Sequence, residues 1–297
     1  MSKKKRLSSL VTRTITGILY VALILAAILS NSPEAITWLL ALFAALGVYE
    51  YQTIVGANKY ALMLRIWHAL MAALLLYVAR QAITYGLQSH TFVVALLPYL
   101  LYYTIYLLSE LYRAKRSPFD ELAHAIFAHI YVVLPLATLL LLTSEASQVV
   151  LQERLSGAPH LSRTFWVLPI FLLIWLNDTG AYVIGTLIGR HKLMPHVSPH
   201  KTIEGLLGGL LFTLLGGTAL HLLFPALTTL IYWFGLALII TIFGTWGDLL
   251  ESLLKRTYGV KDSGTILPGH GGILDRLDSL LLATPPAYLY ISLLILS

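Results

Sequence analysis

Long apolar runs alternate with short polar connections along almost the whole chain. Runs of about 20 mainly apolar residues recur, and they lie near residues 10–30, 35–55, 61–80, 91–111, 122–142, 165–187, 204–224, 227–249 and 277–296. A helix of that length crosses the hydrocarbon core of a bilayer. The pattern therefore predicts an all-α fold, a polytopic integral membrane helix bundle of about nine transmembrane helices.

Composition supports the membrane prediction and excludes some kinds of site. The 297 residues are 58% hydrophobic and only 11% charged, and the mean hydropathy is +0.78. These values lie outside the range of soluble globular domains. Because the chain has no cysteine, disulfides, iron–sulfur clusters and thiolate metal sites are excluded. The first apolar run is too long for a signal peptide, so we expect no cleaved leader.

The distribution of basic residues predicts the orientation in the membrane. Seventeen of the 20 Lys and Arg residues lie in the N-terminal segment and the even-numbered connections, whereas Arg80, Arg154 and Arg163 lie in the others. Basic connections stay in the cytoplasm, which predicts a cytoplasmic N-terminus. Topology thus accounts for the net charge of +6, and we expect no nucleic-acid partner. Size and the lack of long extensions favour a bacterial plasma membrane.

Polar residues that could take part in catalysis or ligand binding are concentrated in the second half of the chain. We therefore expect N-terminal transmembrane scaffold helices over residues 1–160 and a C-terminal transmembrane catalytic region over residues 161–297. Asp178 interrupts the sixth apolar run, and an aspartate there marks either a functional site or a buried helix-packing hydrogen bond. Ser198 to Gly205 opens the seventh run and includes Lys201. A helix start with a lysine suits a phosphate, but it also fits an ordinary capped helix.

After Asp178 and the Ser198–Gly205 segment, a third group of polar residues extends from the eighth apolar run to the ninth. Asp248, Glu251, Ser252 and Lys255 are spaced to share one helix face, and Asp275 and Asp278 are spaced likewise. Paired carboxylates without His or Cys suit a hard cation, above all magnesium, and nearby Lys and Arg side chains suit phosphate chemistry. A solvated charged loop is the alternative, but it does not explain carboxylates on two separate spans.

At this point the sequence resembles a known family. The run from Ser252 to Asp278 reads S-x-x-K-R-x4-K-D-x-G-x-x-L-P-x-H-G-G-x-x-D-R-x-D. It resembles the signature of the phosphatidate cytidylyltransferases, the CDP-diacylglycerol synthases, and the blocks at 177–182 and 198–205 are similar to further family blocks. The chain departs from the usual family pattern with His200 and Ile203, where Lys and Trp are usual.

The resemblance implies a reaction in which CTP and phosphatidate, a membrane lipid, give CDP-diacylglycerol and pyrophosphate with Mg²⁺ as cofactor, at a site on the cytoplasmic side. It implies metal binding by Asp248, Asp275 and Asp278, and neutralisation of phosphate charge by Lys255, Arg256 and Lys261. The expected substrate-binding residues are Asp178, Ser198, Lys201, Thr202, Glu204, Ser252, Asp262, His270, Gly271, Gly272 and Arg276.

Three questions stay open at the level of sequence. A CTP-dependent polyprenol or phytol kinase would share the membrane setting and the nucleotide, although the intact signature argues against it. A transporter would need ionisable groups at all membrane depths, whereas these are concentrated on one side. The glycine-rich seventh and eighth runs offer surfaces either for a homodimer or for internal packing.

Overall fold

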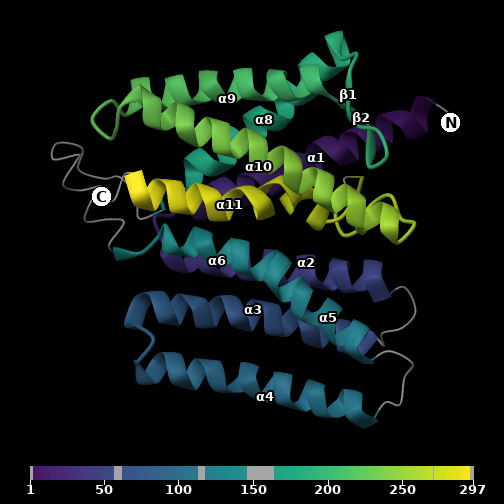
Figure 1. Cartoon of the computed structure of the whole chain (residues 1–297), viewed down its shortest axis with the longest axis vertical. Helices are drawn as coiled ribbons and strands as arrows, with labels where there is room; N and C mark the ends of the chain where they lie inside the picture. Colours follow the sequence, from purple (N-terminus) through teal and green to yellow (C-terminus); the bar gives the residue numbers. More distant parts are fainter. Residues whose placement is uncertain (1–2, 57–61, 113–117, 146–163, 270, 295–297) are drawn as a thin grey trace. The chain divides into compact units, whose positions relative to one another are not determined.

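The computed structural model describes residues 3–56, 62–112, 118–145, 164–269 and 271–294, and Figure 1 shows their arrangement. The chain divides into two compact units. Unit 1 contains residues 1–140 and 262–274, and unit 2 contains residues 141–261 and 275–297. Within the described residues, eight helical segments are long and apolar enough to cross a membrane. The prediction of an all-α polytopic membrane protein is therefore confirmed.

Unit 1 is built from the N-terminal helices. They are α1 (Lys3–Leu29), α2 (Pro33–Gly56), α3 (Leu62–Tyr85), α4 (His90–Tyr112), α5 (Pro118–Ala128), the π-helical turn η1 (His129–Val133) and α6 (Leu134–Leu141). The last three form one continuous segment, and α2, α3 and α4 lie side by side (Figure 1). The most buried of these helices is α2, whose Gly47 allows Val132 of η1 to approach closely.

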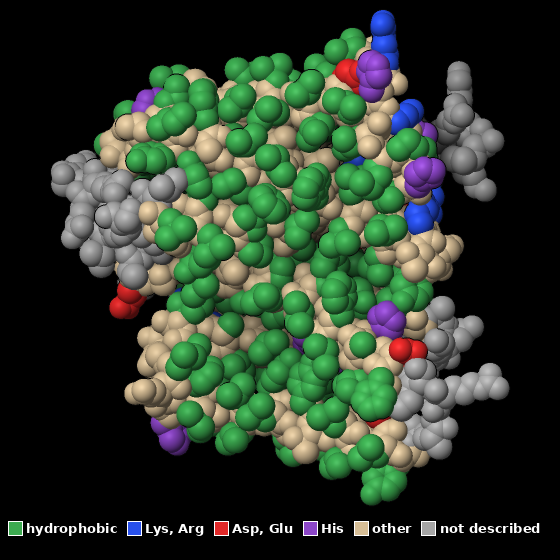
Figure 2. Space-filling model, viewed as in Figure 1, with side chains coloured by type: hydrophobic (Ala, Val, Ile, Leu, Met, Phe, Trp, Pro, Cys, Tyr) green, Lys and Arg blue, Asp and Glu red, His purple; other side chains and the backbone are tan. Residues whose placement is uncertain are grey.

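Unit 2 contains α8 (Val167–Ile188), β1 (Lys192–Met194), β2 (Ser198–Thr202), α9 (Ile203–Leu223), α10 (Leu230–Thr257) and most of α11 (Leu274–Leu294). The strands form an antiparallel hairpin in which Lys192 pairs with Thr202 and Met194 pairs with Ser198. The sequence did not predict this hairpin. Figure 2 shows apolar side chains over the visible face of α9 and α10, with basic and histidine side chains gathered over the hairpin.

Glycines allow the helices of unit 2 to approach one another. Gly208 of α9 lies against Ile184 of α8, and Gly209 lies against Asn177, so that a Cβ at either position would collide with the neighbouring helix. Gly217 faces the backbone of Trp233 in α10. Small residues at such crossings are typical of membrane helix packing. The glycine-rich face of α9 is therefore used inside the unit, and the homodimer stays a prediction.

The ninth apolar run forms α11, which is not among the eight segments that meet the criteria for a membrane span. Its first turns carry Asp275, Arg276 and Asp278, and Pro285 and Pro286 lie in its interior. These charged residues lower the apolar content of the helix. They also line the site described next.

Candidate active site

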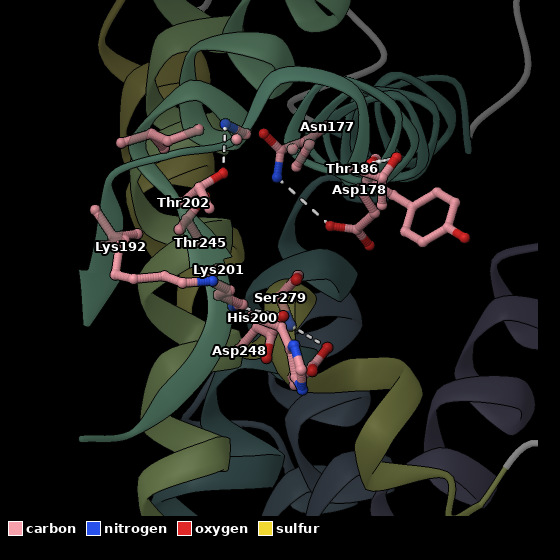
Figure 3. Close-up of a pocket in the computed structure, with 18 of the residues that line it drawn as sticks. Asn177, Asp178, Thr186, Lys192, His200, Lys201, Thr202, Thr245, Asp248 and Ser279 are labelled. Atoms are coloured by element: carbon pink, nitrogen blue, oxygen red, sulfur yellow. Dashed lines mark hydrogen bonds and ion pairs between the residues drawn. The ribbon is translucent and has the colours of Figure 1, made fainter. Parts of the chain in front are cut away.

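Unit 2 contains a cavity of about 670 Å³, whose wall is formed by α8, the β1–β2 hairpin, α9, α10 and α11 (Figure 3). Cavities of about 300–1,000 Å³ typically bind small molecules. The lining residues are Asn177, Asp178, Ala181, Tyr182, Gly185, Thr186, Gly189, Lys192, Leu193, His200, Lys201, Thr202, Gly205, Leu206, Thr245, Asp248, Asp275, Arg276, Asp278 and Ser279.

Carboxylates from three helices face this cavity: Asp178 on α8, Asp248 on α10 and Asp278 on α11. Their negative charges repel one another, and Asp278 is also repelled by Glu251. The backbone N–H of Ser279 donates a hydrogen bond of 2.7 Å to Asp278 Oδ1 and orients that carboxylate. An arrangement of like charges in a membrane protein favours binding of a cation or a cationic group.

Basic side chains share the same cavity. Lys201 Nζ lies 2.5 Å from Asp248 Oδ2, and Ser252 Oγ donates to Asp248 Oδ1 at 3.3 Å. Figure 3 shows Lys201 and Asp248 pointing toward each other, and His200 lies beside them. The cavity therefore presents both positive groups for phosphate oxygens and negative groups for a metal ion.

Local hydrogen bonds at the start of α9 hold Lys201 in place. Thr202 is the N-cap of α9, and its Oγ1 accepts a hydrogen bond of 3.1 Å from Gly205 N. The Glu204 carboxylate accepts hydrogen bonds from the backbone N–H groups of Arg190 and His191, and it pairs with His191 Nδ1 at 2.6 Å. These contacts tie the segment after α8 to the first turn of α9, and so they fix the hairpin that carries Lys201.

Lys255 is enclosed by two carboxylates. Its Nζ lies 2.5 Å from Glu251 Oε2 and 2.7 Å from Asp275 Oδ1. The side chains of Lys255, Glu251 and Asp275 are 12%, 0% and 11% exposed. Glu251 and Lys255 are one helical turn apart on α10, whereas Asp275 belongs to the first turn of α11. This ion-pair cluster therefore joins the C-terminal end of α10 to the start of α11.

The predicted magnesium site fits the cavity in part. The described residues include no group of three His, Cys, Asp or Glu side chains that could share a metal ion, and the Asp275 carboxylate is engaged by Lys255. Magnesium usually takes one or two protein carboxylates and completes its shell with water and substrate phosphates. Asp248 and Asp278, which repel each other at the cavity wall, fit that requirement. The metal site stays a prediction.

Comparison with known proteins places the sequence in a family. The model of the cytidylyltransferase family matches residues 11–294, which is almost the whole chain. The chain belongs to the cytidylyltransferase family. It is 52% identical over 122 residues to a protein of Staphylococcus haemolyticus, 51% identical over 122 residues to one of Staphylococcus aureus, and 48% identical over 120 residues to one of Staphylococcus saprophyticus. Each of the three is named phosphatidate cytidylyltransferase. Each match covers 40% of this chain and 46% of the relative.

Seven of the residues predicted for the functional site line the cavity: Asp178, Lys201, Thr202, Asp248, Asp275, Arg276 and Asp278. The other predicted residues of unit 2, which are Ser198, Glu204, Ser252, Lys255, Arg256 and Lys261, lie outside the lining. Glu204, Ser252 and Lys255 contact residues that hold or form the site, whereas Arg256 and Lys261 are exposed. Asp262, Gly271 and Gly272 belong to unit 1, and His270 lies outside the described residues.

Several members of this cavity were not predicted from the sequence. Asn177 is only 2% exposed, donates weakly to Asp178 Oδ1 at 3.5 Å, and leaves its own Oδ1 without a hydrogen-bond partner. Thr245 and Lys192 also line the cavity. A polar amide within the sixth apolar run was a usable signal for Asn177. Thr245 and Lys192 offered no such signal, because only the folded structure brings them to the cavity.

Proposed function

We propose that the protein transfers the cytidylyl group of CTP to phosphatidate. An oxygen of the lipid phosphate forms a bond to the α-phosphorus of CTP, the bond from that phosphorus to the bridging oxygen breaks, and pyrophosphate leaves. The observation that carries the proposal is the cavity of unit 2, where Asp178, Asp248 and Asp278 meet Lys201 and Arg276. Family membership and the names of the relatives support the choice of CTP and phosphatidate.

The residues of the cavity act by positioning and charge neutralisation. The lipid phosphate is already a nucleophile, so the reaction needs no general base, and its rate depends on alignment and on compensation of negative charge. Lys201, fixed by its ion pair with Asp248, and Arg276 bind phosphate oxygens of the substrates. Arg256 and Lys261 are exposed beyond the cavity lining and attract the triphosphate.

Asp248 and Asp278 would hold Mg²⁺. When bound, the ion neutralises charge on the triphosphate and the leaving pyrophosphate. Asp278→Asn removes one of the repelling carboxylates, so we expect a folded protein whose turnover is lower by about 100-fold or more, roughly 3 kcal/mol of transition-state stabilisation. Asp120→Asn, at an exposed position of α5, is the control and should retain normal turnover. Normal turnover of Asp278→Asn at every magnesium concentration would reject the metal assignment.

The decisive experiment supplies purified protein with phosphatidate and CTP labelled in the α-phosphate, with and without Mg²⁺. Labelled CDP-lipid that forms only with magnesium supports the proposal. Transfer of label from γ-labelled CTP to a polyprenol or another lipid alcohol would instead identify a lipid kinase. Absence of both products would reject both enzymatic functions. Light scattering of the same preparation tests the predicted homodimer.

We further propose that the protein lies in a bacterial plasma membrane with its cavity on the cytoplasmic side, as the excess of basic residues in alternate connections indicates. Because the natural chain has no cysteine, single cysteines report orientation directly. Met194→Cys in the exposed β1 strand should react with an impermeant maleimide only after the cells are opened. Gln88→Cys, between α3 and α4, should react in intact cells. The reverse pattern would reject this orientation.

A further inference from the structure

A buried glutamate in unit 1 contacts both ends of the loop formed by residues 262–274. Glu50 lies on α2 and is 2% exposed. Its Oε2 accepts hydrogen bonds from Ser263 Oγ at 2.9 Å and from Leu274 N at 2.8 Å, and its Oε1 accepts one from Ile273 N at 3.1 Å. Glu50 lies in residues 1–160, which the sequence predicts to be scaffold, whereas the loop lies in the predicted catalytic region.

Two glycines allow the loop to approach this carboxylate. A Cβ on Gly264 would collide with Glu50 Oε1, and a Cβ on Gly272 would collide with Glu50 Oε2 and Ser263 Oγ. Neither glycine has a positive φ angle, so the reason for glycine here is close approach rather than backbone conformation. Gly264 and Gly272 therefore allow the loop to pack directly against the Glu50 carboxylate.

The contacts of Glu50 also define where α11 begins. Leu274 is the first residue of α11, and the first N–H groups of a helix have no partner within the helix. A carboxylate satisfies them and is favoured by the helix dipole. The next residues along the same helix, Asp275, Arg276 and Asp278, line the cavity of unit 2. Because these three residues belong to the first turns of α11, loss of the partners of its first N–H groups would let that end of the helix unwind and would displace their side chains.

We propose that Glu50 is a positioning residue for cytidylyl transfer: its carboxylate fixes the loop and the first turn of α11, and thereby places Asp275, Arg276 and Asp278. The inference rests on the proposed function, because it assigns Glu50 to that site. A purely structural role is the competing explanation. It predicts fewer folded molecules, each with normal activity, whereas a positioning role predicts folded molecules with altered activity.

Glu50→Gln is the informative variant, because it keeps the shape of the side chain. An amide has one acceptor oxygen and places an NH₂ donor against other donors, so at least one of the three hydrogen bonds is lost. We expect kcat/KM for CTP, expressed per folded molecule of the full-length protein, to fall by about fivefold or more. Gln52→Leu is the matched control, since Gln52 lies on the same helix, is 0% exposed and donates to His124 O. Its kcat/KM should stay within about twofold of the natural protein.

Amide hydrogen exchange provides a second measurement that does not depend on catalysis. In Glu50→Gln, peptides covering Ile273 and Leu274 should exchange faster by about tenfold or more, because a hydrogen bond to a carboxylate is lost. The same peptides should be unchanged in Gln52→Leu. If Glu50→Gln does not fold, Ser263→Ala removes one donor and keeps the carboxylate, and it should change both measurements in the same direction.

The outcomes are distinguishable. The inference is overturned if Glu50→Gln, or Ser263→Ala in its place, keeps kcat/KM within about fivefold per folded molecule, or if exchange of the 273–274 peptides does not change. If the natural protein forms no CDP-lipid, the proposed function fails. Exchange then still reports whether Glu50 fixes the loop, but the catalytic role assigned to it fails with that function.

Discussion

Lys255 lies between Glu251 and Asp275. Its replacement by methionine distinguishes two roles for this lysine: neutralisation of phosphate charge and stabilisation of the junction between α10 and α11. The resemblance to cytidylyltransferases implies that Lys255 neutralises phosphate charge. In the structure its ammonium group is 2.5 Å from one carboxylate and 2.7 Å from the other, and none of the three side chains is more than 12% exposed. We therefore expect its main effect to be on the junction between α10 and α11.

The geometry of this ion-pair cluster predicts the order of folding stability among the variants. Lys255→Met leaves two buried carboxylates facing each other, and loss of one partner from a buried ion pair costs about 3–5 kcal/mol of folding stability. Glu251→Gln leaves the Lys255–Asp275 pair balanced, and it should cost about 1 kcal/mol. The double variant has only one uncompensated carboxylate. It should therefore be more stable than Lys255→Met, with a coupling energy of about 1–3 kcal/mol.

Thermal or denaturant unfolding of the purified variants in detergent measures this order, and CDP-lipid formation measures activity in parallel. We expect Glu251→Gln to restore both stability and part of the activity to Lys255→Met. The reasoning is refuted if Lys255→Met is as stable as the natural protein but inactive, and Glu251→Gln restores nothing. That result would assign Lys255 to the phosphates of the substrate.

Two further pairs of variants test the packing and the charges of the cavity. Gly247→Ala places a Cβ against the backbone oxygen of Asp278, so CDP-lipid formation should fall by about tenfold or more. Gly244→Ala, one turn away with its nearest neighbours at 3.7 Å, should stay within about twofold, and equal losses in both would contradict the packing argument. Lys201→Ala should lower kcat by about 30-fold or more, because its ion pair holds it at the cavity. His200→Ala should retain kcat within about threefold, and the opposite ranking would identify His200 as the phosphate ligand.

The helices could be predicted from sequence because the membrane imposes a strong pattern. Each of the nine apolar runs corresponds to a helix or, for residues 122–142, to the continuous segment α5–η1–α6. The β1–β2 hairpin could not be predicted in this way. Its strands have three and five residues, too few for an alternating pattern, and its position depends on hydrogen bonds that Glu204 makes to residues more than ten positions away.

The candidate site was predictable where a charge interrupts an apolar run. Asp178 was found by that criterion, and Asp248 was found by its helical spacing with Glu251 and Lys255; both aspartates line the cavity. The same criterion applied to Glu50, but no neighbouring motif drew attention to it. Helical spacing placed Glu251 and Lys255 on one face, yet it could not show that Asp275 from another helix would take the remaining side of the lysine. Contacts between elements distant in sequence are set by tertiary packing, which periodicity does not encode.

The acidic residues fall into two groups according to how their charge is compensated. Glu50 is satisfied by backbone N–H groups and a hydroxyl, and Glu251 and Asp275 share one lysine. Asp178 and Asp278 instead face a cavity in which carboxylates repel one another. A carboxylate removed from water requires hydrogen-bond donors or a compensating charge. For the first group this compensation is part of the fold, whereas for the second it must come mostly from what enters the cavity. A metal ion would supply that charge. Neutral substitution of Glu251 should therefore mainly lower stability, whereas neutral substitution of Asp178 or Asp278 should lower activity in a stable protein.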